Sequence, residues 1–167
     1  MRSAGRMCGL VFVALALASL SFGQTRIEDL RQRFAQESDP VRKAKKMPQL
    51  GEAEFRQLQK DVTSEQFADA LALLRQYRGE VQSSLQGLDA TGANAEKHSS
   101  GFRQLQISLR ESLRRLDTMI PLISPEAQTG FTEARQDLSE MNRHLIEELF
   151  PRPKQPAKAP HSGDEEH

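Results

Sequence analysis

Apolar residues recur at alternating spacings of three and four in three long stretches of this chain, and that period favours helices. Side chains spaced this way lie on one face of a helix, whereas a half-buried strand needs apolar residues at every second position. No strand-type alternation occurs between Thr25 and Phe150. The predicted stripes are Phe67, Leu71, Leu74, Val81, Leu85 and Leu88; Phe102, Leu105, Leu109, Leu116 and Met119; and Phe131, Ala134, Leu138, Met141, Leu145 and Leu149.

Residues that begin and end helices stand at the edges of these stripes. Thr63-Ser64-Glu65-Gln66 matches a capping box ahead of the first stripe. Ser124-Pro125-Glu126 places a capping hydroxyl, a first-turn proline and a first-turn acid ahead of the third. Asp39-Pro40 does the same for a shorter helix, and Pro121 and Pro151 end the second and third long helices. The boundaries therefore agree with the period.

Three shorter helices are expected ahead of the long ones, at 25–36, 39–47 and 52–60. The segment 89–100 is the longest loop between helices, while the short connection 121–124 predicts that the second and third long helices are antiparallel neighbours. We therefore expect an all-α fold, an antiparallel bundle of three long amphipathic helices with shorter N-terminal helices packed on it. Residues 24–150 would form this single helical domain.

A helical-hairpin solenoid is the alternative architecture. Phe67-Ala68-Asp69-Ala70-Leu71 is similar to the aromatic-x-x-Ala-Leu pattern that opens the second helix of a tetratricopeptide repeat, so 52–85 resembles one such hairpin. The resemblance covers about one repeat, and no second copy follows at the 34-residue period of that family. It implies a tetratricopeptide-like adaptor that binds another protein.

The two ends of the chain carry different signals. Arg2 and Arg6 precede an apolar run over 8–20, and small residues follow it up to Gly23, which predicts a cleaved secretory signal peptide at 1–23. The run is shorter than the roughly 20 residues that span a bilayer. The only cysteine, Cys8, lies inside it, so disulfides are not expected in the mature chain. The segment 151–167 holds four prolines and no large apolar residue, which predicts a disordered, Pro- and charge-rich tail.

The charge balance and the motifs restrict the function. A formal net charge of zero disfavours a dedicated nucleic-acid binder. No nucleophile elbow, zinc-protease motif or phosphate-binding glycine loop is present. We therefore expect no catalytic, cofactor or metal residues and no enzymatic activity, and contact with a membrane only through the signal peptide.

The histidines are the residues most suited to metal or acid–base chemistry. His144 lies four residues from both Glu140 and Glu148 on one helical face, a spacing that could hold a hydrated metal ion. A solvated helix face is the simpler interpretation, because a tight site needs a further ligand from another segment. His98 in the long loop could act as an acid–base residue, and His161 and His167 in the tail could bind a metal ion loosely, but solvated side chains are the simpler interpretation for all three.

Two groups of basic residues could meet an anionic surface or an acidic partner. Arg42, Lys43, Lys45 and Lys46 lie on the second short helix, and Arg103, Arg110 and Arg114 lie on a common face of the second long helix. Glu111 is placed to pair with Arg114 and Arg115, as on an ordinary exposed helix.

Two polar residues interrupt the apolar stripes: Arg78 is expected to extend to water, and Ser112 to bond the backbone.

These patterns favour an exported, non-catalytic helical protein that binds another envelope or secreted protein or assists envelope assembly. A periplasmic bundle that binds a metal ion or small ligand is the alternative. In size, export and helicity the chain resembles periplasmic metal-stress and spheroplast-chaperone proteins, although their Leu-Thr-x-x-Gln motif is missing. The oligomeric state stays open, because a bundle seam and a coiled-coil dimer seam share one apolar pattern.

Overall fold

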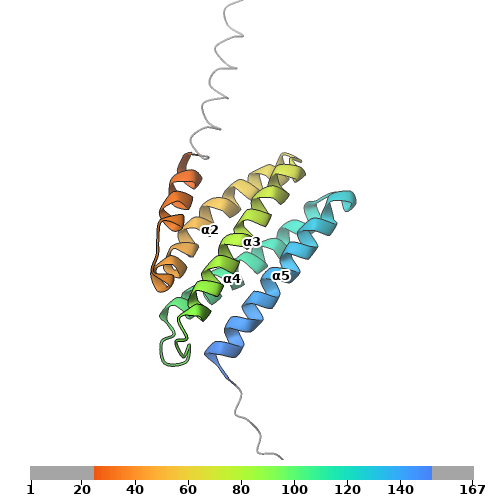
Figure 1. Ribbon diagram of the computed structural model, residues 1–167. Coiled ribbons are helices and arrows are strands. Elements are labelled where there is room, and N and C mark those ends of the chain that lie inside the picture. Colours follow the sequence, from red (N-terminus) through yellow and green to blue (C-terminus); the bar gives the residue numbers. More distant parts are fainter. Residues whose placement is uncertain (1–24, 152–167) are drawn as a thin grey trace, which may run out of the picture.

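The computed structural model describes residues 25–151, and every regular element in that range is helical (Figure 1). A first helix covers 25–35. The remaining elements are α2 (Pro40–Thr63), α3 (Phe67–Ala90), α4 (Ser100–Met119), the 3₁₀ turn η1 (Ile120–Leu122) and α5 (Pro125–Leu149). The predicted signal peptide at 1–23 and the tail beyond Pro151 lie outside the described residues.

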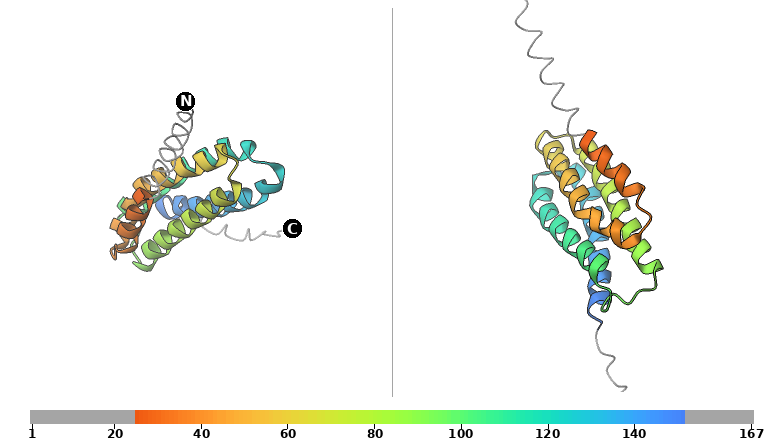
Figure 2. Two further views of the ribbon diagram at one scale, coloured as in Figure 1. Left: turned by 90° about the horizontal axis from the view of Figure 1, so that it is seen from above. Right: turned by 90° about the vertical axis from the view of Figure 1, so that its left-hand side faces the viewer.

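The four long helices run in alternating directions along the chain (Figure 1). Both α2 and α5 pack against α3 and against α4, whereas α3 and α4 meet less closely across the middle of the bundle. Val41 lies against Gly101 at the start of α2 and α4, and Leu71 lies against Gly130 near the start of α3 and α5. The α2–α3 and α4–α5 hairpins are therefore stacked side by side, with α2 parallel to α4 and α3 parallel to α5 (Figure 2).

The sequence was expected to form two short helices at 39–47 and 52–60, and this is wrong. Both belong to the 24-residue helix α2, which continues through Pro48 and Gly51. An internal proline removes one backbone hydrogen bond and favours a break. Here the buried side chains of Met47, Leu50 and Phe55 lie on both sides of it, and their burial offsets that cost. The bundle thus has four long helices rather than three.

The predicted capping box at 63–66 is also wrong, because these residues end α2 instead of starting α3. Gln66 N–H donates to the carbonyl of Asp61 at 2.8 Å, and Glu65 N–H donates to that of Val62 at 3.1 Å. This pair of bonds is the Schellman ending of a helix. Glu65 supplies the left-handed residue that the motif requires, with φ of 59°.

The other predicted helix boundaries agree better with the structure. Asp39 is the N-cap of α2, and its side chain accepts a hydrogen bond from Arg42 N–H at 2.7 Å. Ser124 is the N-cap of α5 with proline in the first turn, but its hydroxyl makes no capping bond. The last long helix ends at Leu149, two residues before Pro151, as expected.

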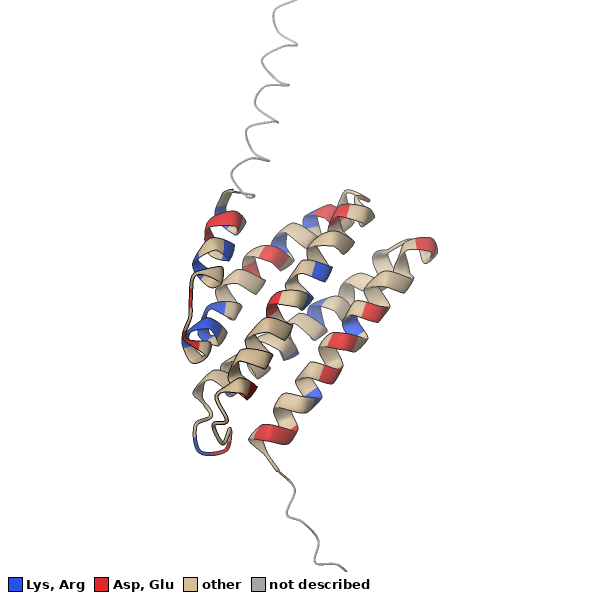
Figure 3. Cartoon of the chain, viewed as in Figure 1, with Lys and Arg blue, Asp and Glu red and all other residues tan. Residues whose placement is uncertain are grey.

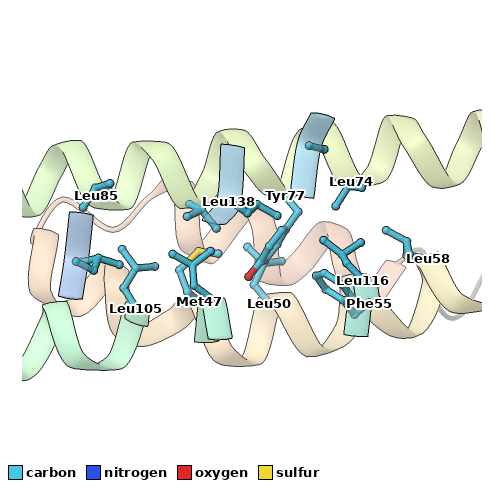
Figure 4. Close-up of a cluster of buried hydrophobic side chains, with 14 of the residues drawn as sticks. Met47, Leu50, Phe55, Leu58, Leu74, Tyr77, Leu85, Leu105, Leu116 and Leu138 are labelled. Carbon is cyan, nitrogen blue, oxygen red and sulfur yellow. The ribbon is translucent and has the colours of Figure 1, made fainter. Parts of the chain in front are cut away.

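One apolar core runs the length of the bundle between the hairpins (Figure 4). Phe55 and Tyr77 meet edge to face, with ring centroids 5.1 Å apart. Gly51 makes room for the Tyr77 ring, since a Cβ at position 51 would lie 3.0 Å from Cε2 of Tyr77. The predicted stripes supply most of the core, although Phe67, Leu71 and Met141 are only partly buried.

Candidate functional site

A cluster of three charged residues around Glu54, which is almost completely buried, joins helix 25–35 to the first hairpin. Arg31 donates from Nε and Nη2 to Oε1 of Glu54 at 2.9 and 2.6 Å. The same Nε lies 3.4 Å from Oε1 of Glu80 on α3. Glu54 is only 1 % exposed, whereas the Arg31 side chain is partly exposed at 18 %.

Glu54 and Glu80 share the single guanidinium of Arg31, and this excess of acidic groups affects their protonation. Burial raises the pKa of Glu54 to about 8, and the neighbouring charge of Glu80 adds to the effect. Burial also raises the pKa of Glu80. Each carboxyl keeps a buried Oε2 without a hydrogen-bond partner. A proton on Glu54 at neutral pH reduces the repulsion and gives Glu54 a donor toward Glu80.

This cluster secures helix 25–35 to the first hairpin, and its central carboxyl group, that of Glu54, is enclosed. Ile27 and Phe34 from that helix are buried against the bundle, and Lys43 lies 4.8 Å above the Phe34 ring. An acid–base residue has to reach the group that it protonates. With Glu54 enclosed, the cluster is arranged for holding two segments together.

A second buried polar cluster joins α3 to α4. The Tyr77 hydroxyl lies 2.6 Å from that of Ser112, which donates to the Ser108 carbonyl at 3.0 Å. The expected backbone bond of Ser112 is thus confirmed. Burial raises the pKa of Tyr77 to about 12, so the phenol stays neutral. Each hydroxyl has a partner, and the arrangement fixes how α3 packs on α4.

Arg78 lies at the seam between α3 and α5. Its side chain extends to the surface, as expected, but it ends on Asp137 of α5 at 2.5 Å rather than in water alone. This half-exposed pair links the second helices of the two hairpins.

The histidine candidates do not come together. His144 Nε2 lies 3.2 Å from Oδ2 of Asp89 on α3, and no bond joins it to Glu140 or Glu148. His98 is exposed in the loop. No group of three potential metal ligands occurs among residues 25–151. His161 and His167 lie outside the described residues.

The basic cluster at the start of α2 is largely neutralised locally. Arg42 and Lys46 each lie 3.2 Å from the Glu37 carboxylate. The backbone N–H of Asp39 and these two cations hold the pKa of Glu37 below its usual value. Lys43 lies over the Phe34 ring, and within residues 25–151 neither Lys43 nor Lys45 forms an ion pair.

The second basic group stays on the surface of α4. Arg103, Arg110 and Arg114 are exposed on one face with Ile107, whose side chain is 44 % exposed. Arg114 pairs with Glu111 at 2.9 Å, as expected. Arg103 and Arg110 have no acidic partner within the described range.

Packing separates the charges of the bundle by layer. In one layer, α2 carries six Lys and Arg residues and three acidic residues, and α4 carries four Lys and Arg residues and two acidic residues. In the other layer, α3 carries two basic and three acidic residues, and α5 carries two basic and six acidic residues. Figure 3 shows the acidic residues along α5. Sequence reasoning missed this segregation, because it depends on which helices become neighbours.

No helix within residues 25–151 is long and apolar enough to cross a membrane. No protein-family model matches the chain, and no curated protein or solved structure matches it either.

Proposed function

We propose that this protein is an exported, non-catalytic interaction module that binds an acidic partner protein on its α2–α4 layer. The observation that carries the proposal is the segregation of charge, with basic residues in excess on α2 and α4 and acidic residues in excess on α3 and α5. A surface of one sign attracts and orients a partner of the opposite sign. The export part of the proposal rests on the signal-peptide pattern at 1–23.

The seam between α2 and α4 adds an apolar anchor point to this charge. A hollow there is lined by the apolar residues Pro48, Phe55 and Ile107 and by Glu52, Glu111 and Arg115, of which Arg115 pairs with both glutamates. Interfaces combine a small desolvated apolar centre with a polar rim. An acidic segment carrying one or two apolar side chains would place those apolar side chains in the hollow and its carboxylates against the exposed basic residues of the layer outside it.

The stacking of the hairpins supports the adaptor form of this proposal. Like helices lie parallel in adjacent hairpins, which is how helical-repeat adaptors build binding surfaces. The helices themselves are longer than in a tetratricopeptide unit: α2 and α3 contain 24 residues each, whereas one whole repeat contains 34. The shared feature is the stacking of hairpins rather than the repeat.

The test is cross-linked affinity capture from the native cell envelope, using protein expressed with its own N-terminus. The test variant is Lys45→Glu/Arg56→Glu, which reverses charge on the exposed side of α2. The matched control is Arg75→Glu/Lys97→Glu, which reverses two exposed charges outside the α2–α4 layer.

We expect one reproducible acidic partner that is retained by the control and lost by the α2 variant. Equal capture by both folded variants would overturn the assignment of the surface. An enzymatic turnover that depends on one polar side chain would overturn the non-catalytic role.

A further inference from the structure

A second hollow lies beside the α2–α4 seam, between helix 25–35 and the outer side of α2 (Figure 2). Its volume is about 330 Å³, and it opens to solvent. Three basic residues line this basic hollow: Arg26 comes from the first helix, and Arg56 and Lys60 come from α2. Positive charge from two separate elements therefore meets at one place.

The positive charge of the basic hollow is only partly neutralised within the fold. Glu52 is the one acidic residue that lines it, and Nε of Arg56 lies 2.8 Å from the Glu52 carboxylate. The same carboxylate also pairs with Arg115 on α4. Within residues 25–151 neither Arg26 nor Lys60 forms an ion pair. Glu52 thus serves two guanidinium groups, and the hollow keeps an excess of positive charge that attracts an anion.

The walls of the basic hollow are held in place and are suited to an anion. Ile27 lines the hollow next to Arg26 and is only 6 % exposed, so helix 25–35 is packed firmly against the bundle at this point. An apolar wall excludes water from one side of the hollow, which strengthens the attraction between opposite charges. Gln49 and Gln57 also line it, and their amide groups can donate hydrogen bonds to an anionic oxygen.

The basic hollow adjoins the hollow at the α2–α4 seam. Glu52 lines both of them, and the seam hollow continues from it toward Ile107 on α4. Arg56 and Lys60 follow Glu52 at spacings of four, so the three residues lie on one face of α2. A ligand only a few residues long can therefore occupy the two hollows together.

We propose that the basic hollow binds a carboxylate of an acidic peptide segment, while an apolar side chain of the same segment enters the seam hollow. A guanidinium group binds a carboxylate through paired N–H donors, and a lysine ammonium group adds a compact positive charge. The charge of the lining residues favours an anion over a neutral or cationic ligand. The adjoining apolar hollow favours a carboxylate that is part of a peptide over a free ion.

This inference rests on the proposed function and specifies where on the molecule the acidic partner is held. Of the cations at the basic hollow, the two without an internal ion pair, Arg26 and Lys60, carry the contact. Sequence reasoning did not group them with any other basic residues, because 34 positions separate them along the chain.

The test is fluorescence anisotropy of a labelled peptide, Glu-Glu-Leu-Glu-Glu, titrated with the full chain expressed with its own N-terminus. We expect saturable binding at low ionic strength, and none for the matched peptide with glutamine in place of each glutamate. Arg26→Glu/Lys60→Glu should weaken binding at least tenfold. The control Arg75→Glu/Lys97→Glu changes the net charge equally and should stay within about twofold of the wild type. Circular dichroism confirms that each variant is folded.

The apolar part of the inference is tested with Ile107→Ser and a second peptide that has serine in place of leucine. Ile107 is 44 % exposed, so its replacement leaves the core intact. We expect Ile107→Ser to bind the leucine peptide about threefold more weakly than the wild type does. The serine peptide should bind equally to both proteins. An equal loss for the two peptides would overturn the placement of the apolar side chain.

The basic hollow would be overturned if the acidic peptide showed no saturable binding, or if the control variant lost as much affinity as Arg26→Glu/Lys60→Glu. Affinity capture separates this failure from failure of the proposed function. A partner retained by Arg26→Glu/Lys60→Glu but lost by Lys45→Glu/Arg56→Glu overturns the basic hollow and leaves the α2–α4 surface in place. A partner retained by both variants overturns the proposed surface itself.

Discussion

At the scale of single residues, the Arg31–Glu54–Glu80 cluster places two carboxyl groups around one guanidinium inside the fold. Burying two acids with one base is unfavourable unless a proton reduces the net charge. The raised pKa of Glu54, about 8, expresses this preference for the protonated carboxyl. The cluster therefore links the pH of the surroundings to the stability of the fold.

We expect the free energy of unfolding to fall as the pH rises from about 4.5 to 8. Over this window the folded chain keeps a proton on Glu54 that the unfolded chain releases, so each step up in pH favours unfolding, by at most about 1.4 kcal/mol per pH unit. Above pH 8 this contribution is constant, because both states are ionised. Urea unfolding at pH 5, 6, 7 and 8 measures the slope.

Glu54→Gln is the matched variant for this measurement, since glutamine keeps the shape and cannot ionise. Its slope over the same window should be much smaller than that of the wild type. A wild-type slope that persists in Glu54→Gln would show that other groups control the pH dependence.

Glu65 stores strain at the end of α2 that a glycine would relieve. A non-glycine residue at a left-handed φ costs about 1 kcal/mol. Glu65→Gly should therefore raise the free energy of unfolding by about 0.5–1 kcal/mol. Gly92 has φ of +62°, so Gly92→Ala should lower it by a similar amount. Thermal or urea unfolding of Glu65→Gly and Gly92→Ala tests both predictions. Changes of the same sign in the free energy of unfolding would contradict the assignment of backbone strain to these left-handed positions.

At the scale of helices, the sequence predicts which stretches are helical better than it predicts where each helix begins and ends. The three-and-four spacing correctly predicts helices in all three long stretches, because one face of each had to be buried. It fails at Pro48, where the local preference for a break is outweighed by burial of the α2 side chains on both sides of the proline. It fails at 63–66 because threonine, serine and a following acid can begin a helix or follow one, and the Schellman bonds of Glu65 and Gln66 depend on the backbone.

Burial along each helix predicts which apolar residues the fold requires. Leu109 and Leu138 are fully buried, so Leu109→Asp and Leu138→Asp should each lower the free energy of unfolding by several kcal/mol. Leu71 is only partly buried, so Leu71→Asp should cost less than either. Gln76→Asp, at an exposed position, is the control. Similar unfolding midpoints for all four would contradict these burial assignments.

At the scale of the whole molecule, the arrangement of helices determines the surface. Basic residues on 40–63 and 100–119 are separated in the sequence, yet they share one layer because α2 packs beside α4. The sequence predicted the two basic groups individually. It could not predict their common layer, nor the Arg31–Glu54–Glu80 cluster, because each depends on contacts between helices that periodicity does not specify.

The connection between the hairpins has a consequence for the order of folding. Within each hairpin, consecutive helices meet after a short turn, so α2–α3 and α4–α5 can each close at low entropic cost. The α2–α4 and α3–α5 contacts require segments about 60 residues apart, and they come after the loop between α3 and α4. During synthesis α2–α3 is complete before α4 is made, and its inner apolar side stays open until the second hairpin arrives. A chain interrupted at that loop would present that side to chaperones and proteases.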